Sequence, residues 1–280
     1  MTMRSLAGKK CFITGAASGI GRATAIAAAV RGAELLLTDI DATGLSAVVA
    51  KIRGDGGAVR AHAAFDISDL AAVRAFADAI LAAHGSVDVV MNIAGISVWG
   101  AVDRLTAEHW QRCIDVNLMG PIHVIQCLLP PMIAAGRGGH LVNVSSAAGL
   151  FGLPWHAAYS ASKFGLRGLS EVLRFDLRRH GIGVSLVCPG GVDTRLVDTV
   201  QIVGVDPTRE EFQALRRRFR EHAVAPETVA AAILRGVERD QYLVFTSLDI
   251  RIGHWFQNKF ALPYEFVMRR LNDALHRIGS

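Results

Sequence analysis

Residues 10–21 read KCFITGAASGIG, an apolar run that passes directly into a glycine-rich turn. An Ala-rich segment of helical period follows immediately and extends to residue 32. A strand, a glycine turn and a helix in this order predict the first unit of a parallel sheet. Glycine lets the backbone bend sharply and begin a helix whose free N–H groups attract an anion, so the turn also predicts a phosphate site.

The same alternation of short aliphatic runs and longer helical segments continues outward from this unit to residue 246. The predicted strands are Lys10–Thr14, Glu34–Asp39, Ala58–Phe65, Val87–Met91, His140–Val144, Gly183–Val187 and Tyr242–Phe245, and the predicted helices are 19–32, 43–53, 69–84, 107–135, 157–180, 209–222 and 227–239. No linker, repeat or low-complexity tract separates them. We therefore expect an α/β fold, a Rossmann-like doubly wound sheet of seven mainly parallel strands, in one domain that spans residues 1–246.

Composition agrees with a sheet that is covered on both faces, because 51% of the residues are hydrophobic and only 20% are charged. The formal net charge of +5 is spread along the chain, apart from one run at Arg216, Arg217, Arg218 and Arg220. That run has no recognition motif beside it and is typical of a solvated helix face, so we expect no nucleic-acid partner.

The four cysteines, Cys11, Cys113, Cys127 and Cys188, lie far apart and lack the spacing of metal ligands. The histidines form no His-x-x-x-His pair either. We therefore expect buried, reduced thiols and no metal. The first ten residues have no apolar segment ahead of a cleavage site, which favours a cytoplasmic protein.

A carboxylate stands at the end of the second predicted strand, where LLLTD closes with Asp39. It follows the glycine turn by about 20 residues, a position where an acidic side chain accepts hydrogen bonds from the hydroxyls of an adenosine ribose. Asp39 would repel a 2′-phosphate, and neither Ser18 nor Ile40 offers a cation to bind one. NAD(H) is therefore expected in preference to NADP(H), unless Asp39 only caps the turn before Asp41.

The third and fourth predicted strands end in residues that suit the same ligand. Asp66, which precedes Ile67, either accepts a bond from an adenine amino group or caps the helix that begins near Asp69. The fourth strand runs into NIAG at residues 92–95, where small side chains would leave space for a dinucleotide across the crevice.

The segment VNVSSAAG at residues 142–149 places Ser145 and Ser146 at the end of the fifth predicted strand, on the same sheet edge as the glycine turn. Tyr159 and Lys163 stand four positions apart on the next helix, so their side chains share one face. An ammonium there would stabilise a phenolate, whose ordinary pKa is about 10, and make the tyrosine a usable acid or base. Either motif alone is weak, because serines commonly cap helices and Tyr-x-x-x-Lys pairs arise by chance.

Together and in this order, the motifs resemble the short-chain dehydrogenase/reductase family over residues 8–246. The resemblance implies that Ser146 rather than Ser145 is catalytic, together with Tyr159 and Lys163, and that Asn117 holds a water in a proton relay. The cofactor contacts that it implies are Thr14, Gly15, Ser18, Gly19, Ile20, Gly21, Asp39, Asp66, Ile67, Asn92, Ala94, Gly95, Tyr159, Lys163, Pro189, Gly190, Val192 and Thr194. One position departs from the family pattern, since Ile93 stands where a second asparagine is usual.

The activity implied by the resemblance is the interconversion of a secondary or related alcohol and its ketone or aldehyde. Tyr159 would exchange the hydroxyl proton, and Ser146 would hydrogen-bond the same oxygen. Lys163 would lower the pKa of the tyrosine and hold the nicotinamide ribose.

Residues that follow the catalytic strands are mostly apolar, which predicts a lipophilic alcohol or ketone as substrate. Candidate contacts are Ser97, Val98, Trp155 and His156, and by the resemblance residues 195–222 would form a lid. The arginine run in that lid leaves open a 3-oxoacyl reductase or 3-hydroxyacyl dehydrogenase that binds a CoA or carrier-protein thioester. An alternative of another class is a non-catalytic dinucleotide-sensing scaffold, which would have no need for the Ser, Tyr and Lys set.

From residue 247 onward the sequence becomes aromatic and basic and predicts a separate helical extension, 247–280. The extension is too polar to span a bilayer, which takes about 20 mainly apolar residues. We expect it to pack on a neighbouring subunit or over the substrate cleft, in preference to lying on a membrane surface. With the resemblance, the apolar helices at 107–135 and 157–180 predict a homodimer or homotetramer.

Overall fold

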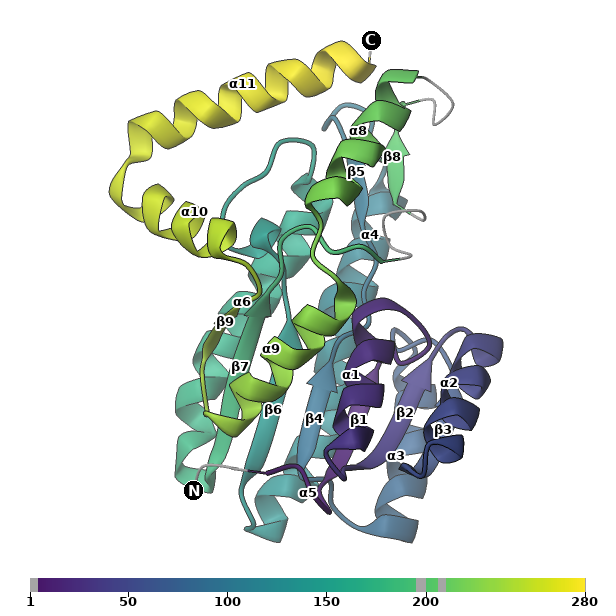
Figure 1. The fold of residues 1–280 in the computed structure, drawn as a ribbon. Coiled ribbons are helices and arrows are strands. Elements are labelled where there is room, and N and C mark those ends of the chain that lie inside the picture. Colours follow the sequence, from purple (N-terminus) through teal and green to yellow (C-terminus); the bar gives the residue numbers. More distant parts are fainter. Residues whose placement is uncertain (1–4, 195–199, 206–209, 280) are drawn as a thin grey trace.

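The computed structural model describes residues 5–194, 200–205 and 210–279 of the chain. Its centre is a seven-stranded sheet in the order β3-β2-β1-β4-β6-β7-β9, in which all neighbouring pairs are parallel (Figure 1). The strands are β1 Lys10–Thr14, β2 Glu34–Asp39, β3 Ala58–Ala64, β4 Val89–Asn92, β6 Gly139–Val144, β7 Ile182–Cys188 and β9 Leu243–Phe245. The predicted doubly wound α/β fold is confirmed.

Helices cover both faces of this sheet (Figure 1). One face is covered by α1 Gly19–Val30, α2 Ala42–Gly54 and α9 Pro226–Glu238, and the other by α3 Leu70–His84, α5 Gly120–Ala135 and α6 Ala157–Asp176. Asp41 and Asp69 cap α2 and α3, since each carboxylate accepts backbone N–H groups of the first helical turn.

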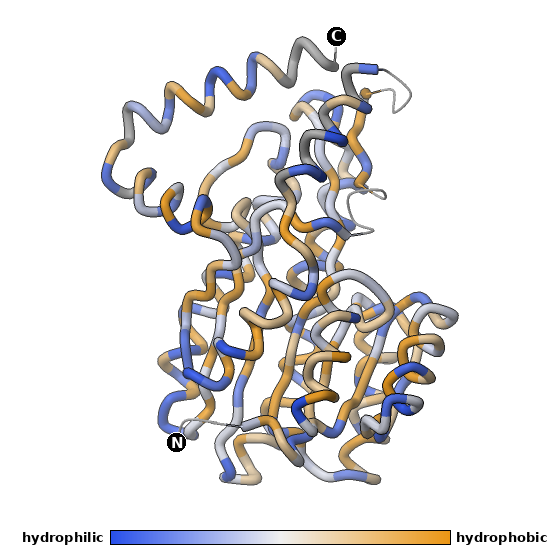
Figure 2. Tube along the Cα trace, in the orientation of Figure 1, coloured by the Kyte–Doolittle hydropathy of each residue, from blue (hydrophilic) through white to orange (hydrophobic). Residues whose placement is uncertain are grey.

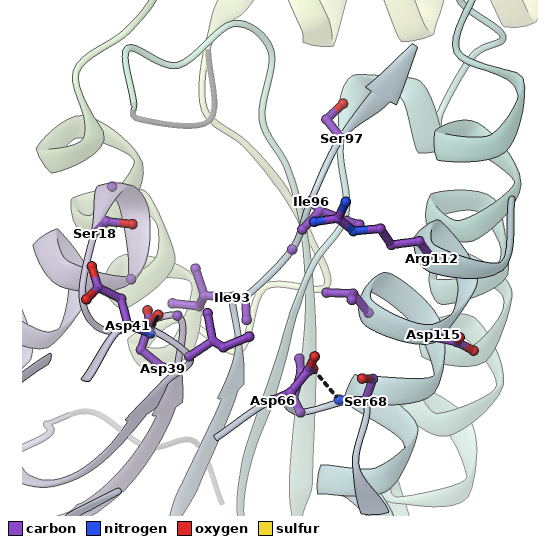
Figure 3. A pocket seen from close by; sticks show the side chains of 18 of the residues that line it. Ser18, Asp39, Asp41, Asp66, Ser68, Ile93, Ile96, Ser97, Arg112 and Asp115 are labelled. Atoms are coloured by element: carbon purple, nitrogen blue, oxygen red, sulfur yellow. Dashed lines mark hydrogen bonds between the residues drawn. The ribbon is translucent and has the colours of Figure 1, made fainter. Parts of the chain in front are cut away.

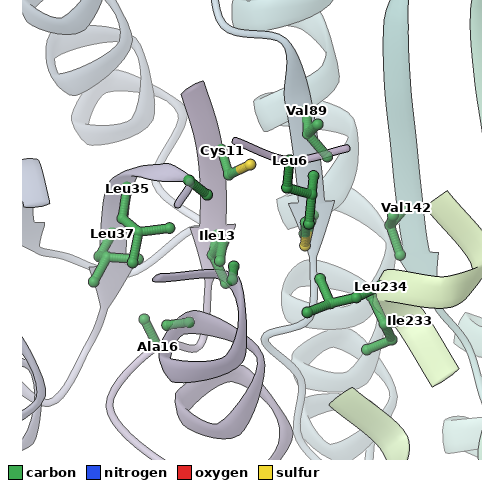
Figure 4. Packing of buried hydrophobic residues seen from close by; sticks show 14 of the residues in the cluster. Leu6, Cys11, Ile13, Ala16, Leu35, Leu37, Val89, Val142, Ile233 and Leu234 are labelled. Atoms are coloured by element: carbon green, nitrogen blue, oxygen red, sulfur yellow. The ribbon is translucent and has the colours of Figure 1, made fainter. Parts of the chain in front are cut away.

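Successive residues of the central strand point into opposite layers of the core. Cys11 and Ile13 pack with α1, α2 and α9, whereas Phe12 packs with α3 and α5. Figure 4 shows the first of these layers, and Figure 2 shows how apolar residues follow the central strands. Because both faces are buried, the strands read as continuous apolar runs in the sequence.

The order of the strands reverses beside β1, since β4 is its neighbour although β2 and β3 come first along the chain. A crevice forms at such a point, beyond the carboxyl ends of the strands. Thr14 lies at the base of this crevice, where its Oγ1 accepts the N–H groups of Ile93 and Ala94, both at 3.0 Å. The ends of β1 and β4 are thereby joined beneath the site.

Two short strands, β5 Val98–Gly100 and β8 Gln201–Val203, are absent from the prediction and form a separate parallel pair. Each has three residues, which is too few for an alternating pattern to show. β8 belongs to the predicted lid 195–222, of which residues 195–199 and 206–209 lie outside the described part of the chain. The lid also contains α8 Glu210–His222.

The predicted helix 107–135 consists of α4 Ala107–Ile114, a π-helical turn at Asp115–Met119, and α5. A hydrophobic period does not reveal such a turn, which is common at functional sites. Within the described residues, 107–135 is the one helical stretch with the length and apolar composition of a membrane span, and it packs against α3 and α6. The predicted helix 157–180 likewise ends early, at Asp176, and a 3₁₀ turn follows it at Arg178–His180.

The expected C-terminal extension is helical and consists of α10 Leu248–Lys259 and α11 Ala261–Gly279. Figure 1 shows both helices on the side of the sheet toward which the strands point. This is also the side on which the crevice opens.

The four cysteines are free thiols, with Cys11, Cys113 and Cys188 buried and Cys127 half-buried. Burial raises the pKa of the Cys11 and Cys188 thiols to about 12, so both stay protonated at neutral pH. Over the described ranges, no group of three potential metal ligands comes together.

A buried histidine joins β6, β7 and the turn before β9. His140 Nε2 lies 2.8 Å from Ser185 Oγ, and Ser185 in turn donates to the Gln241 carbonyl at 2.7 Å. Burial lowers the pKa of His140 to about 4, although Asp240 at 3.7 Å acts in the opposite direction. The imidazole is therefore neutral in the folded chain at neutral pH.

This histidine should make the fold sensitive to acid. The unfolded chain binds a proton at His140 below pH 6.5, whereas the folded chain does not until about pH 4, so stability falls as the pH drops through this window. We expect His140→Gln to remove about 1–3 kcal/mol of this pH dependence, measured by urea unfolding between pH 7 and 4. The control is His62→Gln on the exposed side of β3, and equal slopes in both variants would contradict the assignment.

Candidate active site

A cavity of about 900 Å³ opens beyond the carboxyl ends of the central strands. The predicted cofactor contacts that line it are Gly15, Ser18, Gly19, Ile20, Gly21, Asp39, Asp66, Ile67, Ala94, Gly95 and Thr194, and the predicted substrate contacts that line it are Ser97 and Val98. Residues from five separate segments therefore meet at one hollow, as the sequence predicts for a crevice at a switch point.

The turn after β1 has the shape of a phosphate cradle. A Cβ on Gly21 would lie 1.9 Å from the Gly15 carbonyl oxygen, and a Cβ on Gly15 would lie 2.9 Å from Ala94 Cα. Gly15 and Gly19 also have φ angles of +71° and +50°. These glycines let the backbone approach a ligand at the N-terminus of α1, so the site fits a dinucleotide diphosphate.

Asp39 both shapes the cradle and faces the cavity. Its Oδ2 accepts the N–H of Ala17 and its Oδ1 accepts the N–H of Asp41, both at 2.9 Å. The capping role considered from the sequence is therefore real, and it fixes the orientation of the carboxylate. The remaining lone pairs are free to accept ribose hydroxyls, and Figure 3 shows Asp39 on the same wall as Ser18.

Asp66 lines the same end of the cavity as Asp39, where an adenosine would bind, but on the facing wall. Its Oδ1 accepts the N–H of Ser68 at 2.8 Å, whereas the cap of the following helix is Asp69. The suggested capping of that helix by Asp66 is therefore wrong, and Asp66 keeps its place in the cavity wall (Figure 3). Ile67 beside it packs against Gly120, where a Cβ would come within 2.6 Å of it.

Ser146 is the second residue after the end of β6 and caps the 3₁₀ turn Ala147–Gly149, because its Oγ accepts the N–H of Ala148 at 3.1 Å. The Ser146 side chain also hydrogen-bonds Tyr159, which lowers the pKa of the phenol. Ser145 is buried and donates its hydroxyl to the Lys163 carbonyl at 3.0 Å. The geometry thus pairs Ser146, and not Ser145, with the tyrosine.

Lys163, on α6, lies directly behind Gly95, which lines the cavity. Its Nζ donates to the Val144 carbonyl at 3.0 Å and lies 5.7 Å from the centre of the Tyr159 ring. A Cβ on Gly95 would lie 3.3 Å from Nζ and 2.9 Å from Asn117 Oδ1. Only a glycine at position 95 therefore leaves the ammonium and the amide in place behind the cavity.

Asn117 is fully buried in the π-helical turn and ties two segments together. Its Oδ1 accepts the Ile96 N–H at 2.9 Å, and its Nδ2 donates to the Ile96 carbonyl at 3.0 Å and to Ser162 Oγ at 3.1 Å. Ser162 then donates to the Tyr159 carbonyl at 2.7 Å. Asn117 thus positions the loop after β4 against α6, and its part in a proton relay stays a prediction.

The expected lowering of the Tyr159 pKa by Lys163 is not what the structure shows. Burial raises the pKa of Tyr159 to about 12, and the hydrogen bond from Ser146 only partly offsets this rise. Burial also lowers the pKa of Lys163 to about 8. Removal from water disfavours the charged form of both groups, and the ammonium points toward the Val144 carbonyl instead of the phenol.

An aromatic wall stands beside Tyr159. The rings of Trp99 and His156 lie tilted against each other with their centres 4.3 Å apart, and the centre of the His156 ring lies 6.3 Å from that of Tyr159. Trp99 Nε1 donates to Ser97 Oγ at 2.6 Å, and His156 Nδ1 donates to the Pro154 carbonyl at 2.6 Å. Burial lowers the pKa of His156, so the ring is neutral and its Nε2 is an acceptor.

Seven predicted cofactor contacts are not among the residues that line the cavity, namely Thr14, Asn92, Tyr159, Lys163, Pro189, Gly190 and Val192. Thr14 and Val192 are buried, and Asn92 donates to Asn143 Oδ1 at 2.9 Å within the sheet. The Pro189 carbonyl accepts the N–H of Ala147, and Gly190 is covered by the C-terminal extension. Thr14, Asn92, Pro189, Gly190 and Val192 therefore support the cavity wall from inside the protein.

Sequence reasoning missed one wall of the cavity, which α4 and the π-helical turn supply. Its residues are Glu108, Gln111, Arg112, Asp115 and Val116. Four of them, Glu108, Gln111, Arg112 and Asp115, are spaced so that they share one helix face, and a search for a polar helix face before Asn117 would have found them. Figure 3 shows Arg112 extending from this wall toward Ile96.

Comparison with known proteins agrees with this geometry. The family model for short chain dehydrogenases matches residues 9–202. The chain belongs to the short-chain dehydrogenase/reductase family. It is 40% identical to a D-threitol dehydrogenase of Mycolicibacterium smegmatis over 68% of this chain and 73% of that protein, and 34% identical to the 3-oxoacyl-[acyl-carrier-protein] reductase FabG of Thermotoga maritima over 82% and 90%. It is therefore an oxidoreductase that acts on CH–OH donors.

Solved structures of this dehydrogenase/reductase family superpose over most of the chain. A member from Burkholderia phymatum in complex with NAD has a TM-score of 0.82 and 31% identity, over 92% of this chain and 95% of that one. A metagenomic member in complex with NADP has a TM-score of 0.69 and 34% identity, over 86% and 96%. The fold therefore binds NAD(P), and relatives in complex with either cofactor occur.

Proposed function

We propose that this dehydrogenase/reductase transfers hydride between NAD(H) and a lipophilic secondary alcohol or its ketone, with Tyr159 as the acid/base. The main support is the meeting of Ser146, Tyr159 and Lys163 beside the wall that Gly95 forms. Phenol, hydroxyl and ammonium converge there next to a glycine cradle. No other arrangement in the described part of the chain combines a proton donor, an oxyanion partner and a dinucleotide site.

A bound nicotinamide dinucleotide would supply the hydride donor or acceptor. Gly15, Gly19 and the N-terminus of α1 would hold its phosphates, and Asp39 its adenosine ribose. In reduction, the Tyr159 hydroxyl gives its proton to the carbonyl oxygen while Ser146 stabilises the developing charge there. In oxidation, the Tyr159 phenolate takes the hydroxyl proton, and the positive nicotinamide of the oxidised cofactor would favour that phenolate.

The pKa of Tyr159 sets how each direction of the reaction should depend on pH. With a pKa of about 12, the phenol is protonated and ready to donate, which suits carbonyl reduction. Oxidation needs the phenolate and should therefore accelerate as the pH rises.

The apolar part of the cavity supports a lipophilic substrate. Ile93, Ile96, Val98 and Val116 line it, and Val98 packs in the same apolar cluster as Tyr159. The name of the D-threitol dehydrogenase relative points instead to a small polyol, and that of FabG to an acyl thioester. A substrate panel that contains all three classes decides among them.

The NAD(H) preference rests on charge at the adenosine end. Among the described residues, the acidic side chains that line the cavity are Asp39, Asp41, Asp66, Glu108 and Asp115, and the basic one is Arg112, on the opposite wall from Asp39 (Figure 3). A 2′-phosphate next to Asp39 would meet a carboxylate that the backbone holds in place.

Replacing this carboxylate should shift the cofactor preference. We expect Asp39→Ser to raise kcat/KM for NADPH relative to NADH by about tenfold or more, because the repulsion is removed while a small polar residue remains. Steady-state kinetics with both cofactors measures the ratio. Asp55→Asn at the exposed end of α2 is the control, and an unchanged ratio in Asp39→Ser would refute the assignment.

The catalytic assignment is tested by Tyr159→Phe, which removes the hydroxyl alone. We expect turnover to fall by about 10²–10⁴ with the best substrate of the panel, while NADH affinity stays within about threefold. Tyr242→Phe is a matched control, because the Tyr242 hydroxyl is buried without a partner in the described structure. Turnover that survives in Tyr159→Phe would overturn the mechanism, and tight NADH binding without any turnover in the wild type would favour the scaffold.

A further inference from the structure

The C-terminal extension touches both loops that carry the catalytic machinery. α10 packs its Ile250 against Gly190, where a Cβ would lie 2.8 Å from Ile250 Cγ1. Gly190 belongs to the loop after β7, whose Pro189 carbonyl accepts the N–H of Ala147 at 2.7 Å. The contact of α10 therefore lies one hydrogen bond away from the turn that Ser146 caps.

α11 contacts the segment that links Ser146 to Tyr159. The Tyr264 hydroxyl donates to the Gly152 carbonyl at 3.0 Å. Its ring and the Ile250 side chain pack against the apolar cluster that contains Phe151 and Leu153. Backbone and side chains of the loop are thus both engaged by the extension.

The loop at residues 149–156 determines how the catalytic groups face one another. It begins at the 3₁₀ turn after Ser146 and ends at His156, whose ring contacts those of Trp99 and Tyr159. Trp155 has a φ of +65°, an unusual conformation for a large side chain, and its carbonyl accepts the Gly100 N–H at 2.8 Å. Such a conformation persists only where surrounding contacts hold it.

The residues of the extension that contact the loop are distinct from those that face solvent. Ile250 and Tyr264 are half-buried, whereas Leu248, Trp255 and Phe266 are 68%, 56% and 59% exposed. The extension therefore offers inner residues that meet the loop and outer residues of similar size that do not. This difference allows a matched test.

We propose that α10 and α11 hold the loop 149–156 in the position that catalysis requires, and that they thereby form part of the active site. Tyr264 is the main positioning residue and acts through the Gly152 carbonyl. Ile250 supports the same loop through Gly190. The kinetic test of this proposal rests on the proposed function, whereas the hydrogen-exchange test does not.

The test compares Tyr264→Phe, Tyr264→Ala and the control Phe266→Ala in the full-length chain. We expect Tyr264→Phe to lower kcat/KM for the carbonyl substrate about three- to tenfold, because one hydrogen bond to the loop is lost, and Tyr264→Ala to lower it further. The NADH dissociation constant should stay within about twofold, since the glycine cradle is untouched. Phe266→Ala should match the wild type in both.

Amide hydrogen exchange gives a second readout that needs no turnover. The N–H groups of Phe151 and His156 are bonded to the carbonyls of Ala147 and Leu153, and they should exchange about tenfold faster in both Tyr264 variants. Unchanged exchange and unchanged kcat/KM in Tyr264→Phe would overturn the proposal, as would equal losses in Phe266→Ala. If the wild type reduces no carbonyl, the proposed function fails, and exchange alone still decides the role of Tyr264.

Discussion

A buried ammonium sets the geometry of this site. Lys163 Nζ is held by the Val144 carbonyl at the end of β6, directly behind Gly95 and near the Tyr159 ring. A charge removed from water is costly unless neighbouring dipoles compensate it, so the strand end, the glycine and the helix must keep their relative positions. The π-helical turn at Asn117 completes this packing by fastening the loop after β4 to the same helix.

Most of the fold could be predicted because its determinants are local. The run Leu35, Leu36 and Leu37 is apolar at every position, which indicates a strand buried on both faces, and the structure places it beside β1. Short strands such as β5 and β8 could not be predicted, since their pairing depends on segments about a hundred residues apart. The π-helical turn could not be predicted for a related reason, because hydrogen bonds from Asn117 to residues distant in the sequence stabilise it.

The sequence could predict which residues form the candidate site, but not their pKa values or their hydrogen-bond partners. Spacing identified Ser146, Tyr159 and Lys163, yet it could not show that burial raises the pKa of the phenol and that the ammonium bonds to a carbonyl. Spacing also could not separate Thr14 and Asn92, which bond within the protein core, from Gly95, which lines the cavity. Solvent exposure and hydrogen-bond partners are settled only when distant segments meet.

The ionisation of Tyr159 is the most direct test of the catalytic role assigned to this site. It can be read as the difference in phenolate absorbance between the wild type and Tyr159→Phe during a pH titration, with and without NAD⁺. We expect no Tyr159 phenolate in the protein alone at pH 10, where an ordinary tyrosine is about half ionised, and a lower pKa with NAD⁺, whose positive nicotinamide favours the anion. An ordinary pKa that does not respond to NAD⁺ would show that Tyr159 lies outside the reaction centre.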